Sequence, residues 1–159
     1  MFVWQNINAS RVDVTGLDIA ATYNYTINNR HSLKLQGHYS YQHAVDKSAK
    51  SSPSYNKQIA YIPNHTFSMT ATWTNPWLNI TIDSNGQSGR WATNAHNADT
   101  HIPGYAEFGI TAFRTITFAR SQSLKLSLTL SNILNKQYEI VAHYPMPGHG
   151  WRANLSYAF

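Results

Sequence analysis

The chain has 159 residues and a formal net charge of +5, and only 12% of its residues are charged whereas 42% are hydrophobic. It contains no cysteine, which excludes a disulfide framework and a thiolate metal site. The basic residues form no run, so the composition gives no support for a nucleic-acid partner.

Seven segments alternate between apolar and polar residues with a period of two, which predicts β-strands rather than long helices. The clearest is 123–132, in which four leucines alternate with Ser, Lys and Thr. The segment 107–118 is less regular, because Arg114 falls on the apolar side and Phe113 on the polar side. In chain order, the predicted strands lie at 17–27, 32–42, 66–74, 78–83, 107–118, 123–132 and 151–159.

The connections between these segments alternate in length. Short ones are predicted at 27–31, 74–77 and 119–123, and long ones, rich in Ser, Asn, His, Pro and Gly, at about 44–57, 91–103 and 133–148. Barrels of the bacterial outer membrane have short turns on the periplasmic side and longer loops outside the cell. The alternation therefore predicts an antiparallel meander whose two rims differ.

Aromatic residues gather at both ends of the predicted strands. Beside the short connections lie Tyr25, Trp73, Trp77, Phe118 and Phe159, and beside the long ones Tyr41, Trp91, Tyr105 and Trp151. Two such belts are typical of strands that meet both membrane–water interfaces. The polar face carries mostly Ser and Thr, which favours a sheet between lipid and a wide lumen over a soluble β-sandwich.

The last third of the chain resembles the C-terminal end of TonB-dependent outer-membrane receptors. There, a leucine-alternating strand runs into Asn132-Ile133-Leu134-Asn135-Lys136-Gln137-Tyr138, a loop Tyr144-Pro145-Met146-Pro147-Gly148 follows, and a final strand ends in Phe159. Earlier, 12–25 is similar to a strand of the family, with Asp18 where Glu is usual, and 61–73 resembles its Pro-x-His strand entry. The loop 144–148 and the stretch 75–81 are similar to cobalamin-receptor-like members.

The resemblance implies an all-β fold, an antiparallel transmembrane β-barrel meander of about seven strands that is part of a 22-stranded barrel. It implies that residues 1–159 are the C-terminal segment of a TonB-dependent receptor β-barrel. The plug domain, which fills the lumen in the family, is expected to be absent from this segment, and its first residues show no signal-peptide pattern. Seven strands of so wide a barrel leave two unpaired edges, which is unfavourable in lipid. The chain alone is therefore not expected to transport anything.

The same resemblance implies a function in the bacterial outer membrane. The intact protein would be a nutrient uptake receptor for TonB-dependent active transport of cobalamin or an iron chelate. Its partners would be outer-membrane lipid, the remainder of the receptor barrel and plug, and the barrel-assembly machinery, with TonB reached only through the plug. No enzyme and no cofactor are expected, because the seven carboxylates show no paired acid–base spacing and no serine lies in a nucleophile elbow.

The long loop 133–148 is the best candidate for ligand contact, through His143, Tyr144, Pro145, Met146 and Pro147. The open alternative is that this segment only orders the loop and fixes the register of the hairpin. No metal site is predicted, because the loop histidines His96, His101, His143 and His149 have no recognised ligand spacing. By resemblance to outer-membrane proteins, the signal for barrel assembly would lie in Trp151, Leu155, Tyr157 and Phe159.

Two other interpretations stay open from the sequence. If residues 2–10 form an eighth strand, the chain could be a small self-contained eight-stranded outer-membrane barrel with a structural or adhesion role. Such a barrel fills its interior with side chains, and the small polar face fits a wide lumen better. The third interpretation, a soluble β-sandwich binding module, is disfavoured by the aromatic belts and the charge-poor faces.

Overall fold

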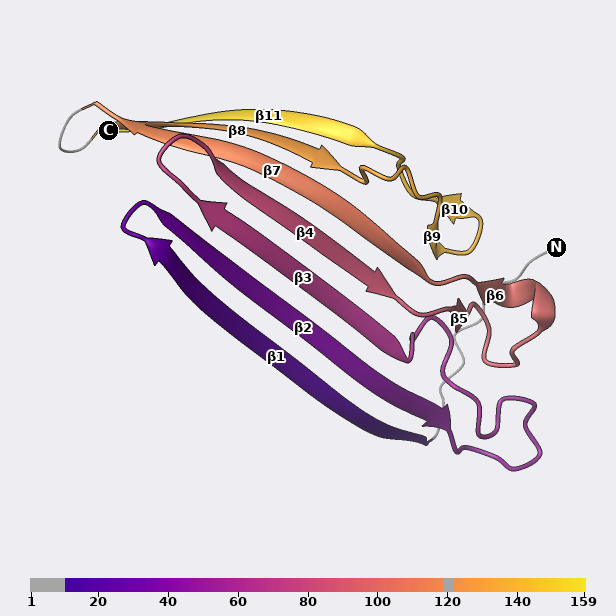
Figure 1. Cartoon of the computed structure of the whole chain (residues 1–159). Coiled ribbons are helices and arrows are strands. Elements are labelled where there is room, and N and C mark those ends of the chain that lie inside the picture. Colours follow the sequence, from indigo (N-terminus) through magenta and orange to yellow (C-terminus); the bar gives the residue numbers. More distant parts are fainter. Residues whose placement is uncertain (1–10, 119–121) are drawn as a thin grey trace.

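The computed structural model describes residues 11–118 and 122–159 of the chain. Seven strands form one antiparallel sheet, in which each strand pairs with the strands before and after it, in the order β1-β2-β3-β4-β7-β8-β11 (Figure 1). Their bounds are β1 Val12–Asn28, β2 His31–Asp46, β3 His65–Thr74, β4 Asn79–Gln87, β7 Tyr105–Thr117, β8 Ser123–Ser131 and β11 Gly150–Ala158. The predicted seven-stranded meander is confirmed. The possible eighth strand at 2–10 lies outside the described residues.

The short turns and the long loops lie at opposite ends of the sheet. In Figure 1 the turns at 29–30 and 75–78 and the C-terminus gather at the upper left, and the segments 47–64, 88–104 and 132–149 gather at the right. The first long loop begins later than predicted, because β2 continues to pair with β1 as far as Val12 and Asp46. The predicted short connection at 119–123 lies partly outside the described residues.

The long loops contain short elements that the sequence pattern does not predict. β5 (Arg90–Trp91) pairs with β6 (His101–Ile102), β9 (Glu139–Val141) pairs with β10 (Tyr144–Pro145), and η1 (Ala98–Thr100) is a short 3₁₀ helix. Strands of two or three residues are too short for an alternating pattern to identify. No helix in the described part of the chain is long and apolar enough to cross a membrane.

The register assembles one continuous apolar face. Residues directly opposite each other in antiparallel strands point to the same side of the sheet, so a single row can be followed across all seven strands. This row consists of Tyr23, Leu35, Ala71, Ile82, Ile110, Leu130 and Trp151. Most of the large apolar side chains on this face are exposed, for example Met69 at 61% and Leu155 at 67%. An exposed apolar surface of this extent marks a membrane or protein interaction surface.

The opposite face of the sheet is polar and consists of the alternate residues of each strand. One row across the seven strands consists of Asn24, Lys34, Thr72, Thr81, Thr111, Thr129 and Arg152. Threonine hydroxyls bridge neighbouring strands along it, at 3.0 Å between Thr72 and Thr81 and at 3.0 Å between Thr111 and Thr129. Phe113 interrupts this face, as its sequence position predicts, and the Lys125 ammonium lies 4.8 Å from its ring centroid.

Side-chain packing is concentrated at the long-loop end rather than within the sheet. The buried apolar residues of the described chain are Ala44, Val45 and Ile102, which lie at the end of β2 and in the second long loop. Four of the five buried polar residues, Asp46, Gln58, Arg90 and Asn132, lie at the same end. The sheet is thus a thin wall, and the packed part of this molecule is the group of loops at one rim.

Candidate functional site

The first and second long loops are joined by hydrogen bonds between side chains and backbone. Lys57 Nζ donates to the Ala95 carbonyl at 2.6 Å, and the Ala60 amide donates to Asn94 Oδ1 at 2.6 Å. His96 Nε2 donates to the Gln58 carbonyl at 2.7 Å, which fixes the proton on that nitrogen. The two loops therefore form one surface.

The Gln58 side chain anchors the first long loop to the end of β2. Its Oε1 accepts from the Ala44 amide at 2.9 Å, and its Nε2 donates to the Gln42 carbonyl at 3.1 Å. The pairing of β2 with β3 ends at Tyr41 and His65. Beyond that point the buried side-chain amide of Gln58 bonds the edge of β2 in place of β3, with both ends of the amide satisfied. The sequence gives no signal for this role.

Arg90 joins the second long loop to the third. Its side chain is 3% exposed, and its guanidinium donates to the carbonyls of Glu139, at 3.3 Å, and of Ile140. Nearby, the rings of Tyr105 and Tyr138 stack with centroids 3.9 Å apart. Nothing in the sequence indicates this role of Arg90, because one arginine in a polar loop has no pattern that predicts burial.

Tyr138, the last residue of the family-like segment 132–138, donates its hydroxyl to a carboxylate oxygen of Glu107. Burial and this carboxylate together raise the pKa of Tyr138 well above the ordinary value for tyrosine. The hydroxyl therefore stays protonated, and the hydrogen bond persists, at neutral pH. This contact ties the third long loop to β7.

Replacing Tyr138 with phenylalanine is expected to loosen this connection by about 1 kcal/mol, because a hydrogen bond to a partly buried carboxylate is lost while the ring stacking is kept. Amide hydrogen exchange in 132–138 would rise by several-fold. In the wild type, the stabilisation by this hydrogen bond decreases above about pH 10, where an unfolded tyrosine ionises first. The variant would lack that decrease. Equal exchange rates in both proteins would contradict the role given to Tyr138.

Asn132 organises the third long loop from within. It is 2% exposed, its Oδ1 accepts from the Lys136 amide at 2.8 Å, and its Nδ2 donates to the carbonyls of Lys136 at 2.9 Å and Pro147 at 3.2 Å. Its φ of 47° and that of Asn135, 49°, lie in the left-handed region that asparagine tolerates better than most residues. This geometry supports the alternative that the segment 132–138 orders the loop.

The predicted ligand-contact residues divide into two groups. Tyr144 is 70% exposed, and the neighbouring His143 is also exposed, with its amide donating to Glu139 Oε2 at 2.9 Å. Met146 and Pro147 instead hold the loop together, since the Met146 amide donates to the Tyr138 carbonyl at 2.9 Å and the Pro147 carbonyl accepts from Asn132. Pro145, which pairs with Glu139 in the β9–β10 ladder, is exposed as well. Tyr144, His143 and Pro145 are therefore the members free to meet a ligand, and that role stays a prediction.

Aromatic stacking positions two of the loop histidines. His96 stacks on Trp91 with ring centroids 4.9 Å apart, and His101 meets the same indole edge-on at 4.9 Å. Among the residues that the structure describes, no three His, Cys, Asp or Glu side chains are grouped closely enough to hold a metal ion.

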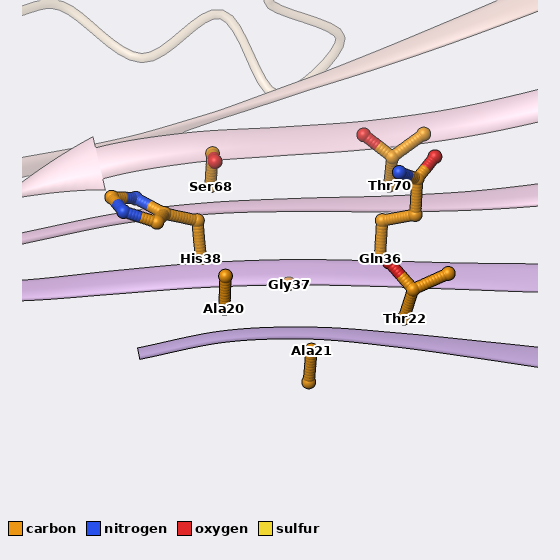
Figure 2. A pocket seen from close by; sticks show the side chains of 8 residues that line it. All are labelled: Ala20, Ala21, Thr22, Gln36, Gly37, His38, Ser68 and Thr70. Atoms are coloured by element: carbon orange, nitrogen blue, oxygen red, sulfur yellow. The ribbon is translucent and has the colours of Figure 1, made fainter. Parts of the chain in front are cut away.

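The polar face has a shallow hollow across β1, β2 and β3 (Figure 2). Figure 2 shows Thr22, Gln36, His38, Ser68 and Thr70 pointing to the same side, whereas Ala21 points to the opposite side. The small side chain of Ala20 leaves space of about 300 Å³ among them. His38 Nε2 lies 4.0 Å from Asp18 Oδ1 at its margin. The hollow can accept a polar group but contains no catalytic arrangement.

These features define a class of protein. A one-layer antiparallel sheet with an exposed apolar face, a polar opposite face, short turns at one rim and long packed loops at the other is the wall of an outer-membrane β-barrel. The chain matches the family model of the TonB dependent receptor-like β-barrel over residues 1–133. It therefore belongs to this family, whose members are bacterial outer-membrane proteins and transporters rather than enzymes.

Solved structures show the same fold. The chain is similar to BauA, the ferric preacinetobactin receptor from Acinetobacter baumannii, with a TM-score of 0.64 and 14% identity over 93% of this chain and 27% of that one. It is equally similar to the ferric citrate transporter FecA, with a TM-score of 0.64 and 15% identity over 94% of this chain and 28% of that one. No curated protein sequence matches the chain. The chain thus spans little more than a quarter of the length of these two proteins.

Proposed function

We propose that this chain is the C-terminal barrel segment of a nutrient uptake receptor that transports cobalamin or an iron chelate in a TonB-dependent manner. The main support for this proposal is that hydrogen bonds join the three long loops into one surface at a single rim of a barrel wall. The segment supplies part of the barrel wall and of the outer loops. The remaining barrel strands pair with the edges of β1 and β11, and the plug that contacts TonB belongs to another part of the receptor.

The charge of the loops supports an iron chelate over cobalamin. The first long loop, 47–64, contains Lys47, Lys50 and Lys57 and no carboxylate, while each of the other two long loops has one basic and one acidic residue. An excess of positive charge at the outer rim attracts an anionic ligand. BauA and FecA, by their titles, handle ferric preacinetobactin and ferric citrate.

Uptake by the intact protein tests this proposal. The protein that carries this chain is expressed in a host whose own receptors for ferric chelates and cobalamin have been deleted. We expect accumulation of a radiolabelled ferric chelate that stops when the proton gradient is dissipated, and none when residues 1–159 are expressed alone. Uptake of cobalamin instead would reassign the substrate. Uptake of neither would contradict the proposal.

Tyr144 offers a local test of ligand contact. Because its ring is exposed at the outer rim, we expect Tyr144→Ala to weaken binding of the transported chelate by roughly three- to tenfold through lost stacking. Tyr144→Phe, which keeps the ring, is the matched control and should bind nearly as well as wild type. Unchanged affinity in Tyr144→Ala would contradict ligand contact and would favour the alternative that the segment 143–147 only orders the loop.

The C-terminal residues are proposed to be read by the barrel-assembly machinery. Trp151, Leu155 and Tyr157 face Leu130, Leu126 and Leu124 of β8 on the apolar side, and the Phe159 ring stacks on Tyr157 with centroids 6.2 Å apart. We expect Phe159→Ala to lower the amount of heat-modifiable protein in the outer membrane by several-fold. Ala158→Gly, which leaves Tyr157 and Phe159 in place, serves as the control. Equal amounts of both variants would contradict an assembly role for Phe159.

A further inference from the structure

Arg114 is an isolated charge on the apolar face of the sheet. The register places it opposite Leu126 of β8, on the side of Ile110 and Ala112 in its own strand. Apart from Asp13 at the long-loop end of β1, it is the only Asp, Glu, Lys or Arg on this face of the seven strands in the described residues. Within residues 11–118 and 122–159, its guanidinium has no hydrogen bond or ion pair, and its side chain is exposed.

An apolar groove begins beside Arg114 and crosses β7, β8 and β11. The groove has a volume of about 590 Å³, within the range of small-ligand sites. Its apolar lining consists of Leu78, Ala112, Leu126, Leu128, Ala153 and Leu155. A hydrocarbon chain is the kind of occupant that such a lining accepts on the lipid-facing side of a barrel.

Arg114 lies near the short-turn rim of the sheet. β7 ends at Thr117, three residues later. With a rise of about 3.3 Å per residue and a tilt of about 45°, the Arg114 backbone lies about 7 Å below that end. The exposed rings of Trp77 and Phe118 mark the membrane interface at the same rim. A long arginine side chain reaches from this depth to the headgroup region.

We propose that Arg114 and this groove bind one phospholipid of the leaflet on the short-turn side, with the guanidinium on the lipid phosphate and an acyl chain along the groove. Guanidinium forms paired hydrogen bonds to phosphate oxygens. No carboxylate of the described residues on this end of the apolar face competes for it. A charge without a partner on the lipid-facing side is unfavourable. At this depth the anion available to Arg114 is the phosphate of a neighbouring lipid.

Native mass spectrometry of the intact protein that carries this chain, extracted from outer membranes in mild detergent, tests the proposal. We expect the wild type to retain one phospholipid and Arg114→Gln to retain about tenfold less, because a charge-assisted hydrogen-bond pair is lost. Arg152→Gln is the matched control, since it removes the same charge from the polar face of β11. It should retain lipid as the wild type does.

Titration of the delipidated protein then separates phosphate recognition from acyl-chain binding. We expect phosphatidylglycerol to bind to the wild type and to Arg114→Lys, diacylglycerol to bind weakly, and Arg114→Gln to lose the difference between them. Arg114→Lys also guards against misfolding, because it keeps the positive charge. Equal lipid retention by Arg114→Gln and Arg152→Gln would overturn the proposal, as would equal binding of both lipids to the wild type. The Arg114 guanidinium would then be hydrated at the membrane interface without binding a lipid.

Discussion

Replacing Leu128 by arginine is expected to lower the stability of the protein in a bilayer by about 2–4 kcal/mol, the cost of a positive charge on the lipid-facing side near the membrane midplane. Leu128 faces Ala112 of β7 and Ala153 of β11, in the middle of the apolar face. Unfolding of the intact protein from lipid vesicles with a denaturant measures the change.

Ser127→Arg is the matched control for this prediction. Ser127 occupies the next position in β8 and lies opposite Phe113 and Asn154 on the polar face. The same side chain introduced there, at nearly the same depth, points into the lumen and is expected to change the stability by less than about 1 kcal/mol. Similar losses in both variants would mean that the two faces of the sheet are wrongly assigned.

Replacing Asn132 by alanine is expected to open the third long loop, at a cost of about 3 kcal/mol. The substitution removes three hydrogen bonds and leaves an amide and two carbonyls without their partner. It also forces alanine into a left-handed conformation with a φ near 47°. Amide hydrogen exchange in 139–149 would become roughly a hundredfold faster, since about 1.4 kcal/mol corresponds to a factor of ten.

Asn135→Gly provides the comparison, because glycine keeps the left-handed conformation and only one hydrogen bond, from the His149 amide to Asn135 Oδ1 at 3.2 Å, is lost. Its exchange rates should rise by less than about tenfold. If Asn132→Ala exchanges no faster than Asn135→Gly, then Asn132 is not the residue that holds this loop.

The sheet could be predicted from the sequence because one physical rule determines it. In a thin wall between lipid and a polar lumen, each strand must alternate, and the period of two is visible without knowledge of the partners. Even the irregular residues Arg114 and Phe113 lie on the faces that their positions predict. The ends of the strands were less predictable, because β2 continues to Asp46 through pairing with β1 that no local pattern reveals.

The loops could not be predicted in the same way. The conformation of the loops depends on side chains such as those of Arg90 and Gln58, which donate hydrogen bonds to backbone carbonyls far away in the sequence. Asn132 belongs to a family-like sequence motif, but its burial and its left-handed φ are seen only in the three-dimensional structure. Tyr144 and His143, both predicted ligand contacts, are exposed and their role stays a prediction, whereas the backbone groups of Met146 and Pro147 hold the loop together.

Cysteine scanning of β8 tests most directly which face of the sheet meets lipid and which meets the lumen. Residues 1–159 contain no cysteine, so single cysteines at 124–130 have no background from this chain, and any cysteine elsewhere in the intact protein is first replaced by serine. We predict that cysteines at 125, 127 and 129 react with a water-soluble maleimide, whereas fluorescent labels at 124, 126, 128 and 130 are quenched by brominated lipid. Uniform reactivity along β8, or alternation in the opposite phase, would contradict the assignment of this chain as a barrel wall with its leucine face toward lipid.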